Sequence, residues 1–186
     1  EVNNYMYSIG EKGVYINMYG GSVLNAKLSD GTSVQLEQIT NYPWDGKITV
    51  VMKAATAMPV NIYMRVPGWS KAYSLKINKQ YPKVRDRDGG FVIAVKKWNA
   101  GDSIVLDFEM PATLIESHPL VEETRNRVTV KRGPVVYCLE SADLPGKNIF
   151  DVVIPANTQW KLVPATIAGG KMMALTGQAK ILQGSD

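Results

Sequence analysis

The chain has 186 residues, of which 45% are hydrophobic, enough apolar side chains for one large or two small β domains. Its formal net charge of +4 comes from 21 basic and 17 acidic residues dispersed along the sequence, which disfavours a nucleic-acid-binding function. A single cysteine excludes an intrachain disulfide, and no stretch approaches the roughly 20 apolar residues of a membrane-spanning helix.

Apolar residues alternate with polar ones over most of the first 110 positions, which predicts a series of short strands. Asp30-Gly31 lies between two of these runs and predicts a tight hairpin. We expect the runs at 48–52 and 60–66 to form a central pair, and Phe91, Ile93 and Val95 to be the apolar positions of a later strand. The predicted strands cover residues 14–19, 23–28, 34–36, 48–52, 60–66, 73–77, 91–95 and 104–108.

The pattern changes near His118, where we place a domain boundary. Residues 112–117 continue the first domain as an edge strand, and residues 119–124 favour one helical turn with Glu122 and Arg125 at i,i+3 spacing. Residues 126–140 then predict two strands hinged at Gly133-Pro134, the second apolar on both faces and therefore covered from both sides. Shorter strands are predicted at 149–154, 160–163 and 172–175.

The strands predict an all-β protein in which an antiparallel, jelly-roll-like β-sandwich (residues 1–118) precedes a smaller β-rich domain (residues 119–186). The second domain has little to pack at its end, so we expect an incomplete second sandwich.

The chain offers few groups for catalysis. Cys138 lies between apolar residues of a predicted strand, which favours an inert buried thiol over a nucleophile. His118, the sole histidine, lies at the predicted boundary and favours a structural role. One cysteine and one histidine do not make an ordinary zinc site. Asp45 and Glu116 are the carboxylates of a hypothetical acid/base pair, but their spacing does not favour one.

Four tryptophans lie at predicted strand ends or turns: Trp44, Trp69, Trp98 and Trp160. Aromatic rings in such places either close the core of a sandwich or stack on a ligand. We therefore expect no catalytic, cofactor or metal residue in this chain, and take Trp44, Trp69 and Trp98 as candidates for an interface or a glycan contact.

Several stretches resemble the β-rich C-terminal portion of glycoside hydrolase family 127, the bacterial β-L-arabinofuranosidase-type enzymes. They run in order from Gly13 to Glu140, and the most specific spans residues 117–138. The others are Gly13-Val14-Tyr15-Ile16-Asn17-Met18-Tyr19-Gly20-Gly21, Tyr42-Pro43-Trp44-Asp45-Gly46, Arg65-Val66-Pro67-Gly68-Trp69 and Trp98-Asn99-Ala100-Gly101-Asp102.

The resemblance implies that catalysis belongs to an (α/α)₆ barrel, N-terminal to the sandwich, with a zinc-bound cysteine nucleophile. No position of that centre maps onto this chain, so we expect a fragment that is inactive alone and holds no cofactor. Its implied function is to support the barrel of a hydrolase acting on arabinose-containing plant glycans. The alternative is a carbohydrate-binding module with surface aromatics. Expected partners are the barrel, a second copy or a glycan, and the expected location is the bacterial periplasm or exterior.

Overall fold

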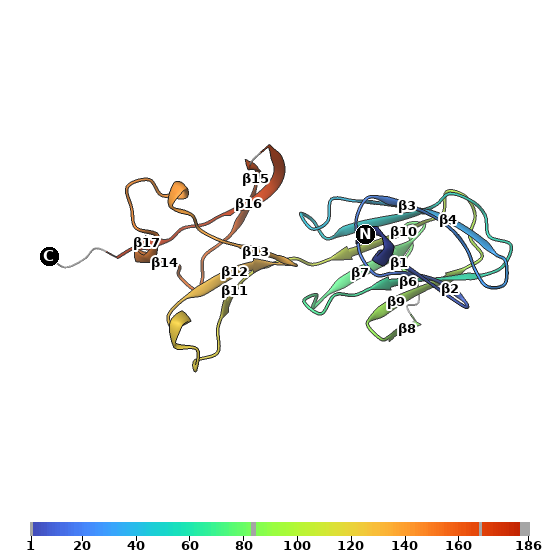
Figure 1. Ribbon diagram of the computed structural model, residues 1–186, viewed down its shortest axis with the longest axis horizontal. Coiled ribbons are helices and arrows are strands. Elements are labelled where there is room, and N and C mark those ends of the chain that lie inside the picture. Colours follow the sequence, from blue (N-terminus) through green and yellow to red (C-terminus); the bar gives the residue numbers. More distant parts are fainter. Residues whose placement is uncertain (1, 83–84, 168, 183–186) are drawn as a thin grey trace. The chain divides into compact units, whose positions relative to one another are not determined.

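The computed structural model describes residues 2–82, 85–167 and 169–182, and it divides the chain into two compact units. These are the N-terminal unit, Glu1–Met110, and the C-terminal unit, Pro111–Asp186 (Figure 1). In the described ranges every regular element is a strand or a short 3₁₀ turn, which confirms the predicted all-β class. Nothing in those ranges forms a helix of the length and apolar character that a membrane crossing needs.

Two five-stranded sheets make up the N-terminal unit as far as the structure describes it. Sheet 1 has the order β1 (Tyr7–Gly10), β2 (Gly13–Ile16), β6 (Val60–Arg65), β9 (Phe91–Lys96) and β8 (Arg85–Asp88). Sheet 2 has the order β3 (Ser22–Lys27), β4 (Ser33–Thr40), β5 (Lys47–Met52), β10 (Ser103–Phe108) and β7 (Tyr73–Ile77). The 3₁₀ turn η1 (Val2–Tyr5) precedes β1.

Alternate side chains of both sheets point inward and form one buried apolar cluster, which confirms the sandwich. Sheet 1 contributes through β2, β6 and β9, and sheet 2 through β4, β5 and β10. The side chains in it with no exposed surface include Ile16, Leu36, Ile48, Met52, Ile62, Met64, Ile104 and Leu106. Their period of two is the pattern from which the strands were predicted.

The Asp30-Gly31 turn joins β3 to β4, as predicted. Gly31 has a φ of +85°, a conformation that a residue with a Cβ adopts only at a cost. The Asp30 Oδ1 atom accepts a hydrogen bond of 2.8 Å from the Thr32 N–H, which fixes the turn from inside.

The expected pairing of residues 48–52 with 60–66 is wrong. Strand β5 pairs with β4 and β10 in sheet 2, whereas β6 pairs in parallel with β2 and antiparallel with β9 in sheet 1. Both strands bury an apolar face in the same core, so alternation cannot reveal that they approach it from opposite sheets. The chain crosses between the sheets through residues 53–59.

The expected apolar face of β9 is also wrong. Its buried side chains are Val92 and Ala94, and Phe91, Ile93 and Val95 face outward. There they lie beside Tyr15 and Tyr63, which their strand registers place on the same side of sheet 1. We call Tyr15, Tyr63, Phe91, Ile93 and Val95 the outer apolar face. Because β9 is apolar on both faces, its sequence does not say which one turns to the core.

Gly13 and Gly46 permit close approaches of the backbone. A Cβ on Gly13 would lie 1.9 Å from the Asn61 oxygen, across the β2–β6 pair. A Cβ on Gly46 would lie 2.1 Å from the Phe108 oxygen, and the Phe108 N–H donates a 3.0 Å hydrogen bond to the Gly46 oxygen. Both glycines belong to motifs shared with the resembling family, and both have a packing role here.

In the C-terminal unit, β11 (Ala112–Glu116), β12 (Val128–Arg132) and β13 (Val135–Tyr137) form a three-stranded sheet. The β12–β13 hairpin turns at Gly133-Pro134, as predicted, with a φ of +57° at Gly133. The other elements are the pairs β14 (Val152–Val153) with β17 (Lys180–Ile181) and β15 (Lys161–Ile167) with β16 (Gly170–Thr176), and the 3₁₀ turns η2 (Glu122–Thr124), η3 (Ser141–Asp143) and η4 (Ile149–Asp151).

The helical turn expected at 119–124 is the 3₁₀ turn η2. The predicted i,i+3 ion pair joins an Arg125 Nη2 and a Glu122 Oε1 atom, 3.6 Å apart. It is exposed, so it contributes little to stability.

The boundary between the units falls between Met110 and Pro111, whereas the sequence suggested a boundary near His118. The reason is β11, which was expected to close the first sandwich as an edge strand. It pairs with β12 along its whole length, from Ala112 opposite Arg132 to Glu116 opposite Val128. A lone strand pattern does not identify the strand with which it will pair.

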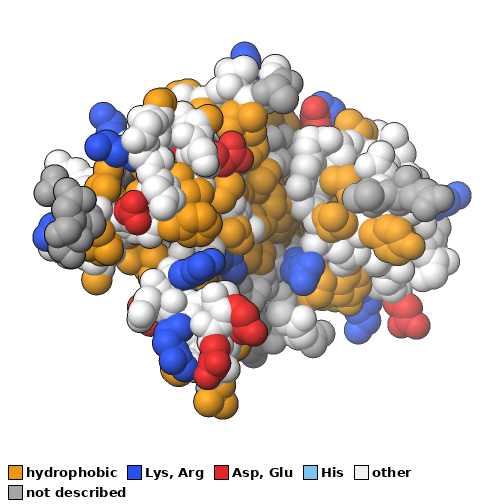
Figure 2. Space-filling model, turned by 60° about the vertical axis from the view of Figure 1, so that its left-hand side comes forward, with side chains coloured by type: hydrophobic (Ala, Val, Ile, Leu, Met, Phe, Trp, Pro, Cys, Tyr) orange, Lys and Arg blue, Asp and Glu red, His pale blue; other side chains and the backbone are white. Residues whose placement is uncertain are grey.

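The C-terminal unit has a thin core. Among its described residues, Val130 is the one hydrophobic side chain that is buried. The strand expected to be covered on both faces has one exposed face, with 61% of the Val136 surface accessible, while Val135 and Tyr137 are half-buried. Figure 2 turns this unit toward the viewer, and hydrophobic side chains occupy much of the visible surface of its nearer part.

We expect the substitution Gly46→Ala to destabilise the N-terminal unit by roughly 3 kcal/mol, because the new Cβ would displace the Phe108 backbone from the edge of the core. Urea unfolding of the purified chain measures the change. Gly68→Ala is the matched control, since nothing lies within 4 Å of a Cβ at Gly68. Equal stabilities for the two variants would contradict the role given to Gly46.

Candidate functional site

One end of the N-terminal sandwich is closed by an aromatic cluster, which we define as Tyr19, Tyr42, Trp69, Tyr73 and Phe108. The Phe108 ring is its centre, with ring centroids 5.5 Å from Trp69, 5.8 Å from Tyr19 and 6.4 Å from Tyr73. Phe108 is 3% exposed, and the other four rings are half-buried against the core. These inclined contacts are the geometry that aromatic pairs favour, so the cluster stabilises this end of the sandwich.

The hydroxyls of two tyrosines of this cluster, Tyr19 and Tyr42, are held in their neutral form. Burial raises the pKa of Tyr19 well above its usual value, and its hydroxyl donates a 2.5 Å hydrogen bond to the Arg65 oxygen. Burial also raises the pKa of Tyr42, against the effect of a hydrogen bond with the Trp69 side chain. Neither hydroxyl therefore supplies a phenolate base near neutral pH, and both fix ring positions instead.

The three tryptophans predicted as contact residues occupy different environments. Trp69 belongs to the aromatic cluster, and Trp44 is half-buried in a turn where its backbone N–H donates a 2.8 Å hydrogen bond to the backbone oxygen of Asn41. Trp98 has no exposed surface, and its Nε1–H donates a 2.8 Å hydrogen bond to the Val60 oxygen. Its ring therefore cannot lie against a glycan or a partner in this structure.

Asp102 is a carboxylate with several polar partners, and the sequence analysis did not single it out. Its Oδ2 atom accepts hydrogen bonds of 2.8 Å from both the Asn99 N–H and the Lys96 ammonium. Its Oδ1 atom accepts a 2.7 Å hydrogen bond from the Asn78 side-chain amide. Asp102 thus connects the turn before β10 to the ends of β7 and β9. A carboxylate following the Asn-Ala-Gly turn was the available signal.

These donors keep Asp102 ionised. Hydrogen bonds from the Asn99 backbone and from Lys96 and Asn78 lower its pKa to about 2, although its burial acts in the opposite direction. A carboxylate with so low a pKa, held by three donors, is a weak base and abstracts a proton from a substrate poorly. The geometry assigns Asp102 a structural role.

The structure places both Cys138 and His118 on the surface. Cys138 follows β13 and is exposed, so the expectation of a thiol packed inside a sheet is wrong. The part of the chain that the structure describes does not form the covering layer that the apolar sequence around Cys138 suggested. His118 is also exposed, and its Nδ1 atom accepts a 3.3 Å hydrogen bond from the Leu120 N–H, a local turn contact.

The carboxylates considered for catalysis are not brought into one site. Asp45 accepts a 3.0 Å hydrogen bond from the Lys47 N–H within its own turn, and Glu116 is exposed at the end of β11 in the other unit. Across residues 2–82, 85–167 and 169–182, no group of three or more His, Cys, Asp or Glu side chains is placed to hold a metal ion.

The sequence matches two protein families along most of its length. Residues 13–110 match the family described as β-L-arabinofuranosidase, GH127 middle domain, and residues 112–171 match the glycoside hydrolase family 127 C-terminal domain. The first match ends and the second begins where the structure divides the chain.

Similar proteins are several times longer than this chain. A non-reducing end β-L-arabinofuranosidase of Bifidobacterium longum subsp. longum is 36% identical over 151 residues, which are 78% of this chain and 22% of that protein. A solved structure of a glycoside hydrolase is 34% identical to this chain with a TM-score of 0.91. The match covers 100% of this chain and 31% of the hydrolase chain. A GH127 β-L-arabinofuranosidase from Geobacillus stearothermophilus T6 is 28% identical with a TM-score of 0.88, the match spanning 99% and 29% of the two chains.

The Asp102 network predicts an acid-sensitive part of stability. Because the folded-state pKa lies below the ordinary value of 3.8, the ionised carboxylate stabilises the fold above about pH 4, and this contribution is lost as the pH falls toward 2. The shift corresponds to roughly 2 kcal/mol. Asp102→Asn should lose about that much at pH 7 and little at pH 2, measured by urea unfolding across this range.

The exposed Glu109 provides the control. Glu109→Gln should follow the unchanged chain at every pH. A constant difference between Asp102→Asn and the unchanged chain from pH 7 to pH 2 would show that the charge of Asp102 is not the source of its contribution.

Proposed function

We propose a function for this chain from the premise that it belongs to glycoside hydrolase family 127, its two units being the middle and C-terminal domains of that family. Their role in this proposal is to pack against and support a catalytic (α/α)₆ barrel in a longer hydrolase. Through that barrel the enzyme would act on arabinose-containing plant glycans. The chain spans less than a third of the relatives' length, which leaves room for such a region.

The outer apolar face of sheet 1 is the observation that carries this proposal. The Tyr15 and Tyr63 rings stack with centroids 4.0 Å apart, and the Phe91 ring meets Tyr15 edge-on at 5.4 Å. Beside them Val95 has 54% of its surface exposed, and Ile93 is half-buried. Sheet 1 is a mixed sheet, and a sheet face covered by solvent alone is ordinarily polar. Tyr63 is 8% exposed and Tyr15 and Phe91 are half-buried, so Val95 is the most exposed member of this apolar group. Exposed apolar surface is typical of an interaction site.

The C-terminal unit supplies independent support. Its exposed apolar residues exceed those it buries, and they include Val136, Leu139, Phe150 and Leu182. A unit with so little buried surface gains little from the hydrophobic effect on its own. Further protein against these residues would supply the missing burial.

The residues of this chain do not fit the zinc centre that the family resemblance implies. Such a centre needs several thiolate ligands, whereas the chain has one cysteine, Cys138, which is exposed. This proposal therefore routes no chemical step through the two units. Their contribution is to the stability of the barrel.

We expect the isolated chain to be inactive. The purified 186-residue chain, incubated with 4-nitrophenyl β-L-arabinofuranoside with and without added Zn²⁺, should release nitrophenol no faster than buffer does. The longer hydrolase is the positive control. Zinc-dependent release by the chain alone would contradict a supporting role.

Docking through the outer apolar face is tested by Val95→Lys. Because Val95 is exposed in this chain, the substitution should change the stability of the chain alone by less than about 0.5 kcal/mol. In the longer hydrolase it should cost roughly 2 kcal/mol or more, since it would place an unpaired charge in an interface. Thermal unfolding of both proteins measures the difference.

Val23→Lys is the matched control, because Val23 is 61% exposed on β3 of the other sheet. It should leave both proteins unchanged. If Val95→Lys leaves the longer hydrolase as stable as Val23→Lys does, docking through the outer apolar face is excluded.

A further inference from the structure

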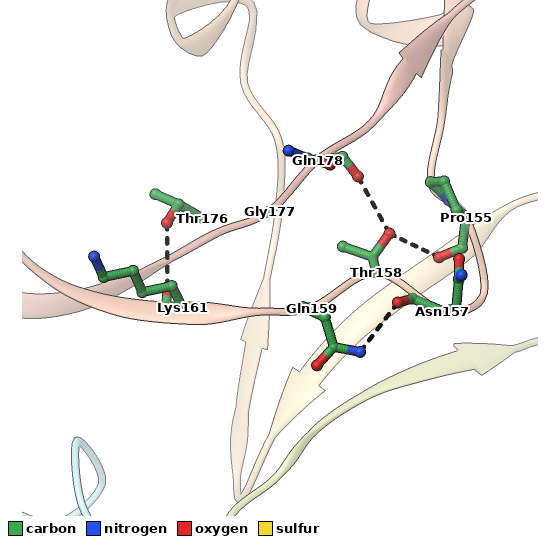
Figure 3. A pocket seen from close by; sticks show the side chains of 8 residues that line it. All are labelled: Pro155, Asn157, Thr158, Gln159, Lys161, Thr176, Gly177 and Gln178. Atoms are coloured by element: carbon green, nitrogen blue, oxygen red, sulfur yellow. Dashed lines mark hydrogen bonds between the residues drawn. The ribbon is translucent and has the colours of Figure 1, made fainter.

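The C-terminal unit contains a partly open cavity of about 530 Å³, with both polar and apolar lining, where β15 and β16 separate. This volume lies within the range of roughly 300 to 1,000 Å³ typical of small-molecule sites. Figure 3 shows its lining, which comes from the segment before β15 and from the end of β16 with the residues after it. The regular pairing of the two strands ends at Lys161 opposite Thr176.

The Thr158 hydroxyl holds the two sides of the cavity in place. Its Oγ1 atom lies 2.8 Å from the Pro155 oxygen and 3.2 Å from the Gln178 oxygen (Figure 3). On the same side, the Gln159 side-chain amide donates a 3.2 Å hydrogen bond to the Asn157 oxygen. Two of these contacts order the segment before β15, and the contact of Thr158 with the Gln178 backbone oxygen joins this segment to the residues after β16.

Gly177 brings a tryptophan against this cavity. A Cβ on Gly177 would lie 2.8 Å from the Thr158 Cγ2 atom and 3.0 Å from two carbons of the Trp160 ring. The half-buried Trp160 ring therefore packs directly on the Gly177 backbone, which lines the cavity. Glycine within or beside a strand is typical of such close approaches.

The chemistry of the lining selects the class of ligand. Its side chains are mainly carboxamides and hydroxyls, which both donate and accept hydrogen bonds, and none is a carboxylate. Lys161 is its one cation, whereas an anion site ordinarily combines several converging donors or cations. A neutral ligand with many hydroxyl groups matches this set.

We propose that this cavity is a binding site for a neutral oligosaccharide, held by the side chains of Asn157, Gln159 and Gln178 beside Trp160. Only the choice of arabinose as the first sugar to test rests on the proposed function. The site itself is argued from the C-terminal unit alone. Its failure would leave the supporting role of the two units intact.

The test is a titration of the ¹⁵N-labelled 186-residue chain with arabinotriose, followed by NMR. We expect saturable shifts of the signals of Thr158, Gln159 and Gln178. Asn157 and Gln178 are exposed, so alanine at both should preserve folding and weaken binding about tenfold. Gln35→Ala in β4 is the control and should leave the affinity unchanged.

Maltotriose and inorganic phosphate complete the test. Saturable shifts at the cavity with maltotriose but not arabinotriose would support the site and count against arabinose as its sugar. Shifts with phosphate alone, shifts confined to Trp44 and Trp69, or no saturable shift with either sugar would overturn the proposal.

Discussion

The N-terminal unit depends on burying one apolar layer between two sheets that are built from interleaved parts of the chain. Every strand of this layer must present its apolar residues to the same narrow space, and the backbones at the edges must close it. Gly13 lets β2 approach β6 closely within sheet 1, and Gly46 lets the turn before β5 approach the end of β10. The turns that join the strands lie at the ends of this apolar layer, and polar contacts hold them there.

The motifs that point to the family are explained by this requirement for closure. Trp98 fills the core while its indole N–H and backbone satisfy the loop at Thr56 and Val60. The Asp102 carboxylate pairs with the Lys96 ammonium and accepts a hydrogen bond from the Asn99 N–H, which orders the turn before β10. Trp69 packs on Phe108 where the same strand leaves the core. Such residues identify the fold because they make its packing and turn contacts, and they say little about catalysis. This fits a chain whose chemistry is proposed to belong to another domain.

The sequence was sufficient for most of the strands, the hairpin turns at Gly31 and Gly133, and the all-β class, because these depend on local periodicity and on single glycine conformations. It missed the short strands β1, β8 and β17, which lack a clear alternation. It was insufficient for sheet assignment. Alternation shows that β5 and β6 each have a buried face, but the choice of partner depends on residues far away in the sequence. It also misled where both faces are apolar, as in β9 and around Cys138. In these places the apolar residues show that both faces of the strand favour burial, but they do not show which face is buried within this chain.

The parallel pairing of β2 with β6 has a consequence for how the chain acquires its structure. Val14 lies opposite Ile62, and all of β3, β4 and β5 are made between them and belong to the other sheet. A ribosome must therefore deliver three strands of sheet 2 before the centre of sheet 1 can form. Because bringing such distant segments together carries a large entropic cost, assembly should be slow, and β2 must remain soluble meanwhile. Strand β2 has only four residues, which limits its tendency to pair with a strand of another nascent chain before β6 is available.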